Sequence, residues 1–164
     1  MACSSTGQVT DISSTSTTVA PTSSSTESTS TTAATVDLDT GDLVGWDTAT
    51  IDVGGQGLLV AVADDPGEWT QGLMGVEQLG DLDGMLFVFP QEHLGGFTMR
   101  ETLIPLDIVF FDDDGTFVDV LSMVPCTAEP CPPYVPEAQY SWALETPTGT
   151  LAPLPEGAVL TLEE

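Results

Sequence analysis

Basic side chains are almost absent from this sequence. Its 164 residues include 26 Asp and Glu but a single Arg and no Lys, so the formal net charge is −25. Binding to nucleic acid or to anionic lipid headgroups depends on Lys and Arg that displace counterions from phosphate groups. The composition therefore argues against nucleic acid as a partner.

Long apolar runs are absent as well. No apolar stretch reaches the length of about 18 residues that a membrane-spanning helix needs. The apolar core of a secretory signal is also missing. The opening Met1-Ala2-Cys3 is nevertheless typical of the end of a bacterial lipoprotein signal, where a small residue precedes the lipidated Cys. The alternative is a chance Cys near a native start. We expect an extracytoplasmic protein, held at a bacterial cell membrane only by a lipid on Cys3.

Cysteines are few, and the sequence holds three. With Cys3 assigned to lipid attachment, Cys126 and Cys131 remain as a pair that closes a short Pro-containing loop. A disulfide fits an oxidising compartment, whereas a zinc site needs about four ligands and the chain offers one His. Redox chemistry is the weakest alternative, because it usually uses CxxC spacing. We therefore predict a disulfide, no metal and no cofactor.

Large apolar side chains are scarce in residues 4–35, where Ser and Thr make up 21 of 32 residues. Such a segment cannot bury enough surface to offset the entropy of its ordering. We expect residues 1–36 to form the lipoprotein-like N-terminus and a disordered stalk, and residues 37–164 to form a single β domain. The length of the chain also favours one domain.

Short apolar runs separated by turn signals predict a mainly β fold. A helix is expected at residues 66–74, because Asp65 can act as N-cap, Pro66 suits the first turn and Glu68 is acidic there. The fold class is an antiparallel β-sandwich or jelly-roll-like barrel of about eight strands with one short helix. The expected strands are residues 49–53, 58–63, 84–89, 97–101, 106–111, 116–123, 140–146 and 158–162.

Several of these segments carry a family resemblance. Gly72-Leu73-Met74, Gly84–Phe89, Phe97–Thr102 and Ile104–Phe110 resemble, in this order, the domain of unknown function 192 family. The later Val124-Pro125-Cys126, Cys131-Pro132 and Ala143-Leu144-Glu145 also fit, so the resemblance covers about residues 50–163. It implies a compact, mostly β domain of jelly-roll type that is often exported, and it implies no established activity. One departure is Gly75-Val76, where members tend to have a basic residue.

Arg100 is the single basic side chain and lies in an apolar strand region. Two interpretations remain open. The guanidinium can form a structural ion pair with Glu101, Asp107 or Glu145, or it can bind an anionic group of a ligand. Asp107 is the natural partner, because a carboxylate in an apolar strand is either paired or solvated.

Polar residues near Arg100 define the candidate ligand-binding site, which comprises His93, Arg100, Thr102, Asp107 and Glu145. The first functional hypothesis is a monomeric, non-enzymatic envelope module that binds an unknown small molecule or envelope protein in a polar cleft near Arg100, Thr102 and Asp107. The alternative is an envelope hydrolase that uses Asp107 with Glu92 or His93, although no catalytic residue can be assigned.

Two further patterns are compatible with ligand binding but have simpler explanations. The acidic run Asp112-Asp113-Asp114-Gly115 matches part of a calcium loop, but the remaining ligand spacing is missing and a solvated hairpin turn explains it better. Trp and Tyr side chains could line a sugar-binding face, and core or rim packing is the more common role. These aromatic residues are Trp46, Trp69, Tyr134, Tyr140 and Trp142.

Overall fold

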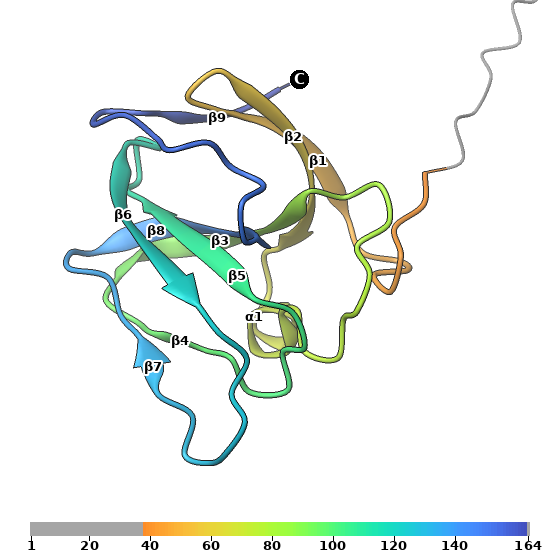
Figure 1. The fold of residues 1–164 in the computed structure, drawn as a ribbon. Helices are drawn as coiled ribbons and strands as arrows, with labels where there is room; N and C mark the ends of the chain where they lie inside the picture. The colour runs from red at the N-terminus through yellow and green to blue at the C-terminus, as the bar shows by residue number, and fades with distance from the viewer. Residues whose placement is uncertain (1–37, 164) are drawn as a thin grey trace, which may run out of the picture. The chain divides into compact units, whose positions relative to one another are not determined.

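The computed structural model describes residues 38–163. Cys3 and the predicted stalk therefore lie outside the described residues. In the described part the fold is mainly β, as predicted, with one short helix (Figure 1). The elements are β1 (Thr48–Val53), β2 (Gln56–Ala63), α1 (Pro66–Gln71), β3 (Gly84–His93), β4 (Phe97–Thr98), β5 (Leu106–Phe111), β6 (Phe117–Met123), β7 (Pro133–Tyr134), β8 (Tyr140–Pro147) and β9 (Leu160–Leu162). No helix among these residues is long and apolar enough to cross a membrane.

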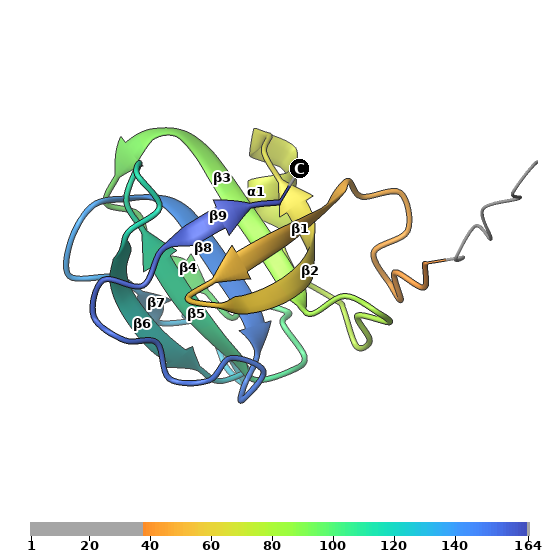
Figure 2. The ribbon, with the colours of Figure 1, turned by 90° about the horizontal axis from the view of Figure 1, so that it is seen from above.

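Seven strands form one sheet in the order β6-β5-β8-β3-β2-β1-β9, and β4 pairs with β7 in a separate two-stranded ribbon. All neighbours in the large sheet are antiparallel except β2 and β3, which are parallel and are connected through α1. The late strand β8 lies between β3 and β5. Figure 2 shows the sheet from above, with β9 beside β1 at one edge.

The large sheet is curled until its two edges meet at one end. Next to β6, Thr116 forms a β-bridge with Val159 beside β9. The amide of Phe117 donates to the carbonyl of Ala158 at 2.9 Å, and the amide of Leu160 donates to the carbonyl of Gly115 at 2.8 Å. These bonds close the sheet locally into a barrel-like fold, which is consistent with the expected sandwich or jelly-roll-like barrel.

Strand alternation divides the apolar side chains between two faces of this sheet. We call the side facing into the curl the inner face. Its core joins residues from both edges and the centre, including Val53, Val60, Leu86, Val109 and Leu160. The other side, the outer face, carries Ala61, Met85, Phe87, Ile108 and Phe110, against which Trp69 of α1, Phe97 of β4 and Tyr134 of β7 pack.

Helix α1 begins as the sequence predicts. The Asp65 carboxylate accepts from the amides of Gly67 at 2.7 Å and Glu68 at 3.0 Å, and Glu68 completes a capping box. The helix ends at Gln71, three residues earlier than expected, because Gly72 adopts a positive φ of 46°.

Strand β3 is longer than expected and continues through Pro90 to His93. The pairing of β3 with β8 shifts between Val88 and His93. Proline is tolerated at such an irregularity, because its missing amide proton is not required by the ladder. The predicted strand at residues 97–101 is reduced to Phe97–Thr98, and the partner strand β7 was not predicted.

Candidate functional site

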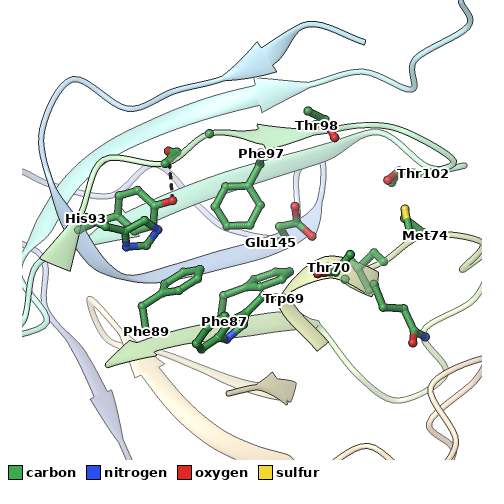
Figure 3. A pocket seen from close by; sticks show the side chains of 16 residues that line it. Trp69, Thr70, Met74, Phe87, Phe89, His93, Phe97, Thr98, Thr102 and Glu145 are labelled. Carbon is green, nitrogen blue, oxygen red and sulfur yellow. Dashed lines mark hydrogen bonds between the residues drawn. The ribbon is translucent and has the colours of Figure 1, made fainter. Parts of the chain in front are cut away.

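A pocket of about 220 Å³ lies on the outer face of the sheet. Strands β3 and β8 contribute Phe87, Phe89, Tyr140 and Glu145, and α1 contributes Trp69 and Thr70. The segment from His93 through β4 to Thr102 and the turn at Met74 complete the wall (Figure 3). We call this the Glu145 pocket.

Glu145 is the buried polar group of this pocket, with 5% of its surface exposed. It lies opposite Met85 of β3 and Ile108 of β5, both fully buried. Residues opposite each other in neighbouring strands share a face of the sheet. The carboxyl group is therefore flanked by apolar side chains and directed into the pocket, as Figure 3 shows.

Burial raises the pKa of Glu145 to about 8. Desolvation disfavours the charged form, and no hydrogen bond or charge within the described residues acts on the carboxyl to oppose it. Near neutral pH the group is therefore mainly the neutral acid. A strongly perturbed carboxyl in a pocket is a physical sign of a functional site.

Aromatic rings line the pocket beside Glu145. Trp69 and Phe89 have ring centroids 5.0 Å apart, as do Phe87 and Phe97. The ring centroids of Phe89 and His93 are 4.2 Å apart. The polar carboxyl is thus combined with aromatic side chains in one pocket.

The hydrogen-bond donors of the lining are largely engaged with the backbone. Trp69 Nε1 donates to the carbonyl of Ala63 at 3.0 Å, and the Tyr140 hydroxyl donates to the carbonyl of Gly95 at 3.1 Å. The hydroxyls of Thr70 and Thr102 donate to the carbonyls of Pro66, at 2.8 Å, and Arg100, at 3.4 Å. The Glu145 carboxyl, by contrast, is available to a ligand.

Two glycines allow the elements around the pocket to approach one another closely. A Cβ at Gly72, which has a positive φ, would lie 3.2 Å from the Phe87 ring. A Cβ at Gly84 would collide with the backbone carbonyl of Glu145. Glycine at these positions therefore lets α1 approach Phe87 and lets β3 approach β8.

The predicted partners of Arg100 are wrong. Its Nε lies 2.8 Å from Oε1 of Glu129, and both side chains are more than half exposed. The amide of Cys131 and then the Arg100 guanidinium lower the pKa of Glu129. The ion pair lies outside the Glu145 pocket, so Arg100 does not contribute to this pocket.

Asp107 is also separate from the Glu145 pocket. It lies on the side of β5 that carries Val109, and it lines a different depression of about 190 Å³. Its two oxygens accept from the hydroxyl of Ser122 at 2.7 Å and the amide of Gly149 at 3.1 Å. The expected polar cleft shared by Arg100, Thr102 and Asp107 therefore does not form.

Three predicted site residues do come together, since His93, Thr102 and Glu145 all line the same pocket. Glu92 is exposed and is not among the lining residues. Sequence reasoning assigned Phe87, Phe89 and Phe97 to strands and missed their position around one pocket. The available signal was that the segments carrying the family resemblance contribute most of the wall.

The cysteine loop lies beside the Arg100 ion pair. Cys126 and Cys131 form a disulfide with their Cα atoms 5.7 Å apart. Across residues 38–163, no cluster of three or more His, Cys, Asp or Glu has a geometry that could hold a metal ion. At the acidic hairpin turn, the Asp112 carboxylate accepts from the amides of Asp114 and Thr116, at 3.1 and 2.7 Å.

The chain is similar to two solved structures. A protein from Sinorhizobium meliloti 1021, described as a "putative transcription regulator", is 28% identical with a TM-score of 0.63, covering 73% of this chain and 96% of that chain. A protein of unknown function from Novosphingobium aromaticivorans is 25% identical with a TM-score of 0.61, covering 73% of this chain and 89% of that chain.

No curated protein matches the chain. The family model DUF192, described as Uncharacterized ACR, matches residues 49–160. The match covers the large sheet except for Thr48 of β1 and the last two residues of β9, and it includes every residue that lines the Glu145 pocket. The match agrees with the resemblance carried by the strand motifs. The chain therefore belongs to the DUF192 family.

Proposed function

We propose that this DUF192 domain is a non-enzymatic module that binds a small organic molecule in the Glu145 pocket. The observation that carries the proposal is the buried carboxyl of Glu145, which is directed into an aromatic pocket and has no partner among the described residues. Burying a carboxyl without a partner is unfavourable for the fold. Such a cost is typical of positions that serve a site rather than stability.

The hydrolase alternative has little geometric support. Asp107 and His93 line different depressions, and both Asp107 oxygens already accept hydrogen bonds. Within the Glu145 pocket, Figure 3 shows His93 at one end and Glu145 near the centre, with the Phe97 ring drawn between them. General acid–base catalysis needs two groups within reach of the same reacting atoms. A binding role requires no such pair.

Transcription regulation through DNA is not part of the proposal, although one similar structure bears that description. Binding to DNA requires several Lys or Arg contacts to phosphates. This chain has one Arg in total, and it is paired with Glu129.

An envelope location is the second part of the proposal. It is supported by Met1-Ala2-Cys3 and by the Ser/Thr-rich segment that follows. With a bacterial lipoprotein signal placed before Cys3, a Cys3→Ser change is expected to release the protein from the membrane fraction. Equal membrane association of both forms would contradict lipid anchoring at Cys3.

The pocket is tested by a fragment screen read by protein NMR shifts. Thr98→Trp is the blocking variant, because Thr98 is an exposed lining residue of β4, and we expect a larger side chain there to obstruct the pocket. Asp107→Asn is the control outside the pocket. Hits should lose at least about tenfold in affinity, or about 1.4 kcal/mol, in Thr98→Trp and keep their affinity in the control. Hits that bind Thr98→Trp as well as the parent, or a screen without hits, would contradict the proposal.

A further inference from the structure

We infer that the ligand of the Glu145 pocket is a small organic cation, an ammonium group with apolar substituents. The inference rests on the proposed function, because it names the ligand class of the same pocket. It is drawn from four features of the lining: the Glu145 carboxyl, the aromatic rings, the donors that already bond to the backbone, and the absence of Lys and Arg.

The charge of the lining favours a cation over an anion. Glu145 is the one carboxyl among the lining residues, and neither Lys nor Arg is among them. The other titratable side chains that line the pocket are His93 and Tyr140. An anionic ligand would find neither Lys nor Arg among the lining residues to pair with, and it would oppose the ionisation of the Glu145 carboxyl. The net charge of −25 would also repel an anion and would attract a cation.

The hydrogen-bonding groups favour a cation over a sugar-like ligand. Four donors of the lining already donate to backbone carbonyls, namely those of Trp69, Thr70, Thr102 and Tyr140. A polyhydroxyl ligand needs several free donors and acceptors around its hydroxyls. An ammonium needs mainly an acceptor. The Glu145 carboxyl supplies a buried one, whereas the polar side chains of Gln71 and Thr98, which also line the pocket, are exposed.

The aromatic rings of the lining provide a second interaction that favours a cation. Rings of Trp69, Phe87, Phe89 and Phe97 line the pocket around the carboxyl. The faces of aromatic rings attract cations, most strongly when water is excluded. A cation with methyl or methylene groups would also bury apolar surface against these rings.

Binding should be coupled to the release of one proton. The carboxyl holds its proton in the empty pocket because burial raises its pKa to about 8. An arriving cation supplies the missing countercharge, so that the carboxyl loses its proton to solvent and forms the ion pair. Affinity should therefore rise by up to about tenfold per pH unit below pH 8 and level off above it.

The test compares choline with 3,3-dimethylbutan-1-ol, a neutral molecule of the same shape, and n-butylammonium with n-butanol. Titration calorimetry at pH 6, 7 and 9 would use the full chain in moderate salt, with Glu145→Gln as test and Asp107→Asn as control. At pH 9, above the pKa of Glu145, both variants remove one negative charge, so a difference between them at that pH cannot come from net charge.

The expected result is that at least one cation binds the parent about tenfold or more tightly than its neutral counterpart. Its affinity should rise from pH 6 to pH 9 in the parent and in Asp107→Asn. In Glu145→Gln, both the preference for charge and this pH dependence should disappear. Thr98→Trp should lower the affinity for the cation, as it should for any ligand of the pocket.

Other results overturn the inference. If the neutral members bind as tightly as the cations, or affinity falls as the pH rises, the ligand is neutral and uses the protonated acid, while the pocket proposal stands. If none of the four probes binds, the cation inference fails, and the fragment screen decides separately whether the pocket binds anything. If Asp107→Asn and Glu145→Gln weaken cation binding equally, the attraction comes from the overall negative charge of the protein and not from Glu145.

Discussion

Two carboxyl groups on neighbouring strands have opposite environments in this domain. Asp107 of β5 lies opposite Thr146 of β8, whereas Glu145 lies one residue along and faces the other side of the sheet. Asp107 is half-buried and accepts two hydrogen bonds, while Glu145 is buried and its pKa is raised by desolvation alone. A shift of one residue along β8 thus changes the face of the sheet, from the side where Asp107 accepts its hydrogen bonds to the side where Glu145 lines the pocket.

The largest expected effect is on the pH dependence of stability. The pKa of Glu145 is about 8 in the folded chain, against a reference value of 4.5. Between these two values the folded state keeps a proton on Glu145 that the unfolded state loses. The contribution of this group to the free energy of unfolding is therefore largest below pH 4.5 and falls as the pH rises to about 8. Relative to Glu145→Gln, the parent should lose about 4 kcal/mol between pH 5 and pH 9.

Urea denaturation near 1 M salt, where self-repulsion is screened, measures this difference. Asp107→Asn is the matched control and should keep the slope of the parent, because it leaves the buried carboxyl of Glu145 unchanged. Equal slopes for the parent and Glu145→Gln would show that Glu145 is solvated, and the contrast with Asp107 would then disappear.

An intermediate effect is expected for Asp107→Ala. The substitution removes the acceptors of the Ser122 hydroxyl and the Gly149 amide. Each net hydrogen bond contributes about 1 kcal/mol, so stability at pH 7 should fall by about 1–2 kcal/mol. Thermal unfolding measures this loss, and any probe bound in the Glu145 pocket should keep its affinity. A stability gain would show that Asp107 is a strained site group rather than an anchor.

The smallest effect is expected for Arg100→Ala. The Arg100–Glu129 ion pair is exposed, and exposed pairs contribute little to stability. The unfolding midpoint should change less than in Asp107→Ala, and binding in the Glu145 pocket should not change. A larger loss than in Asp107→Ala would favour a stronger partner for Arg100 than the exposed Glu129.

The local features of the fold could be predicted from the sequence. Alternating apolar residues located the long strands, and Asp65, Pro66 and Glu68 located the start of α1, because both signals act over neighbouring residues. The length of β3 was underestimated, since Pro90 usually stops a strand and only the irregular pairing with β8 accommodates it.

The polar contacts could not be predicted in the same way. The sequence offers 26 acidic residues as possible partners for its one Arg. The pairing with Glu129 depends on the path of the Cys126–Cys131 loop. The burial of Glu145 follows from apolar packing on both sides of β8, which a single alternation pattern does not reveal. Its position beside Met85 and Ile108 is set by strand order, a long-range property.

The strand order also determines when this domain can be assembled. Strand β8 lies between β3 and β5, so the β1–β3 part and the β5–β6 hairpin share no ladder until residues 140–147 join them. A chain emerging from a ribosome or a secretion channel therefore completes its central sheet only near its end. The same strand brings in Glu145, so the pocket gains its carboxyl in the step that unites the sheet.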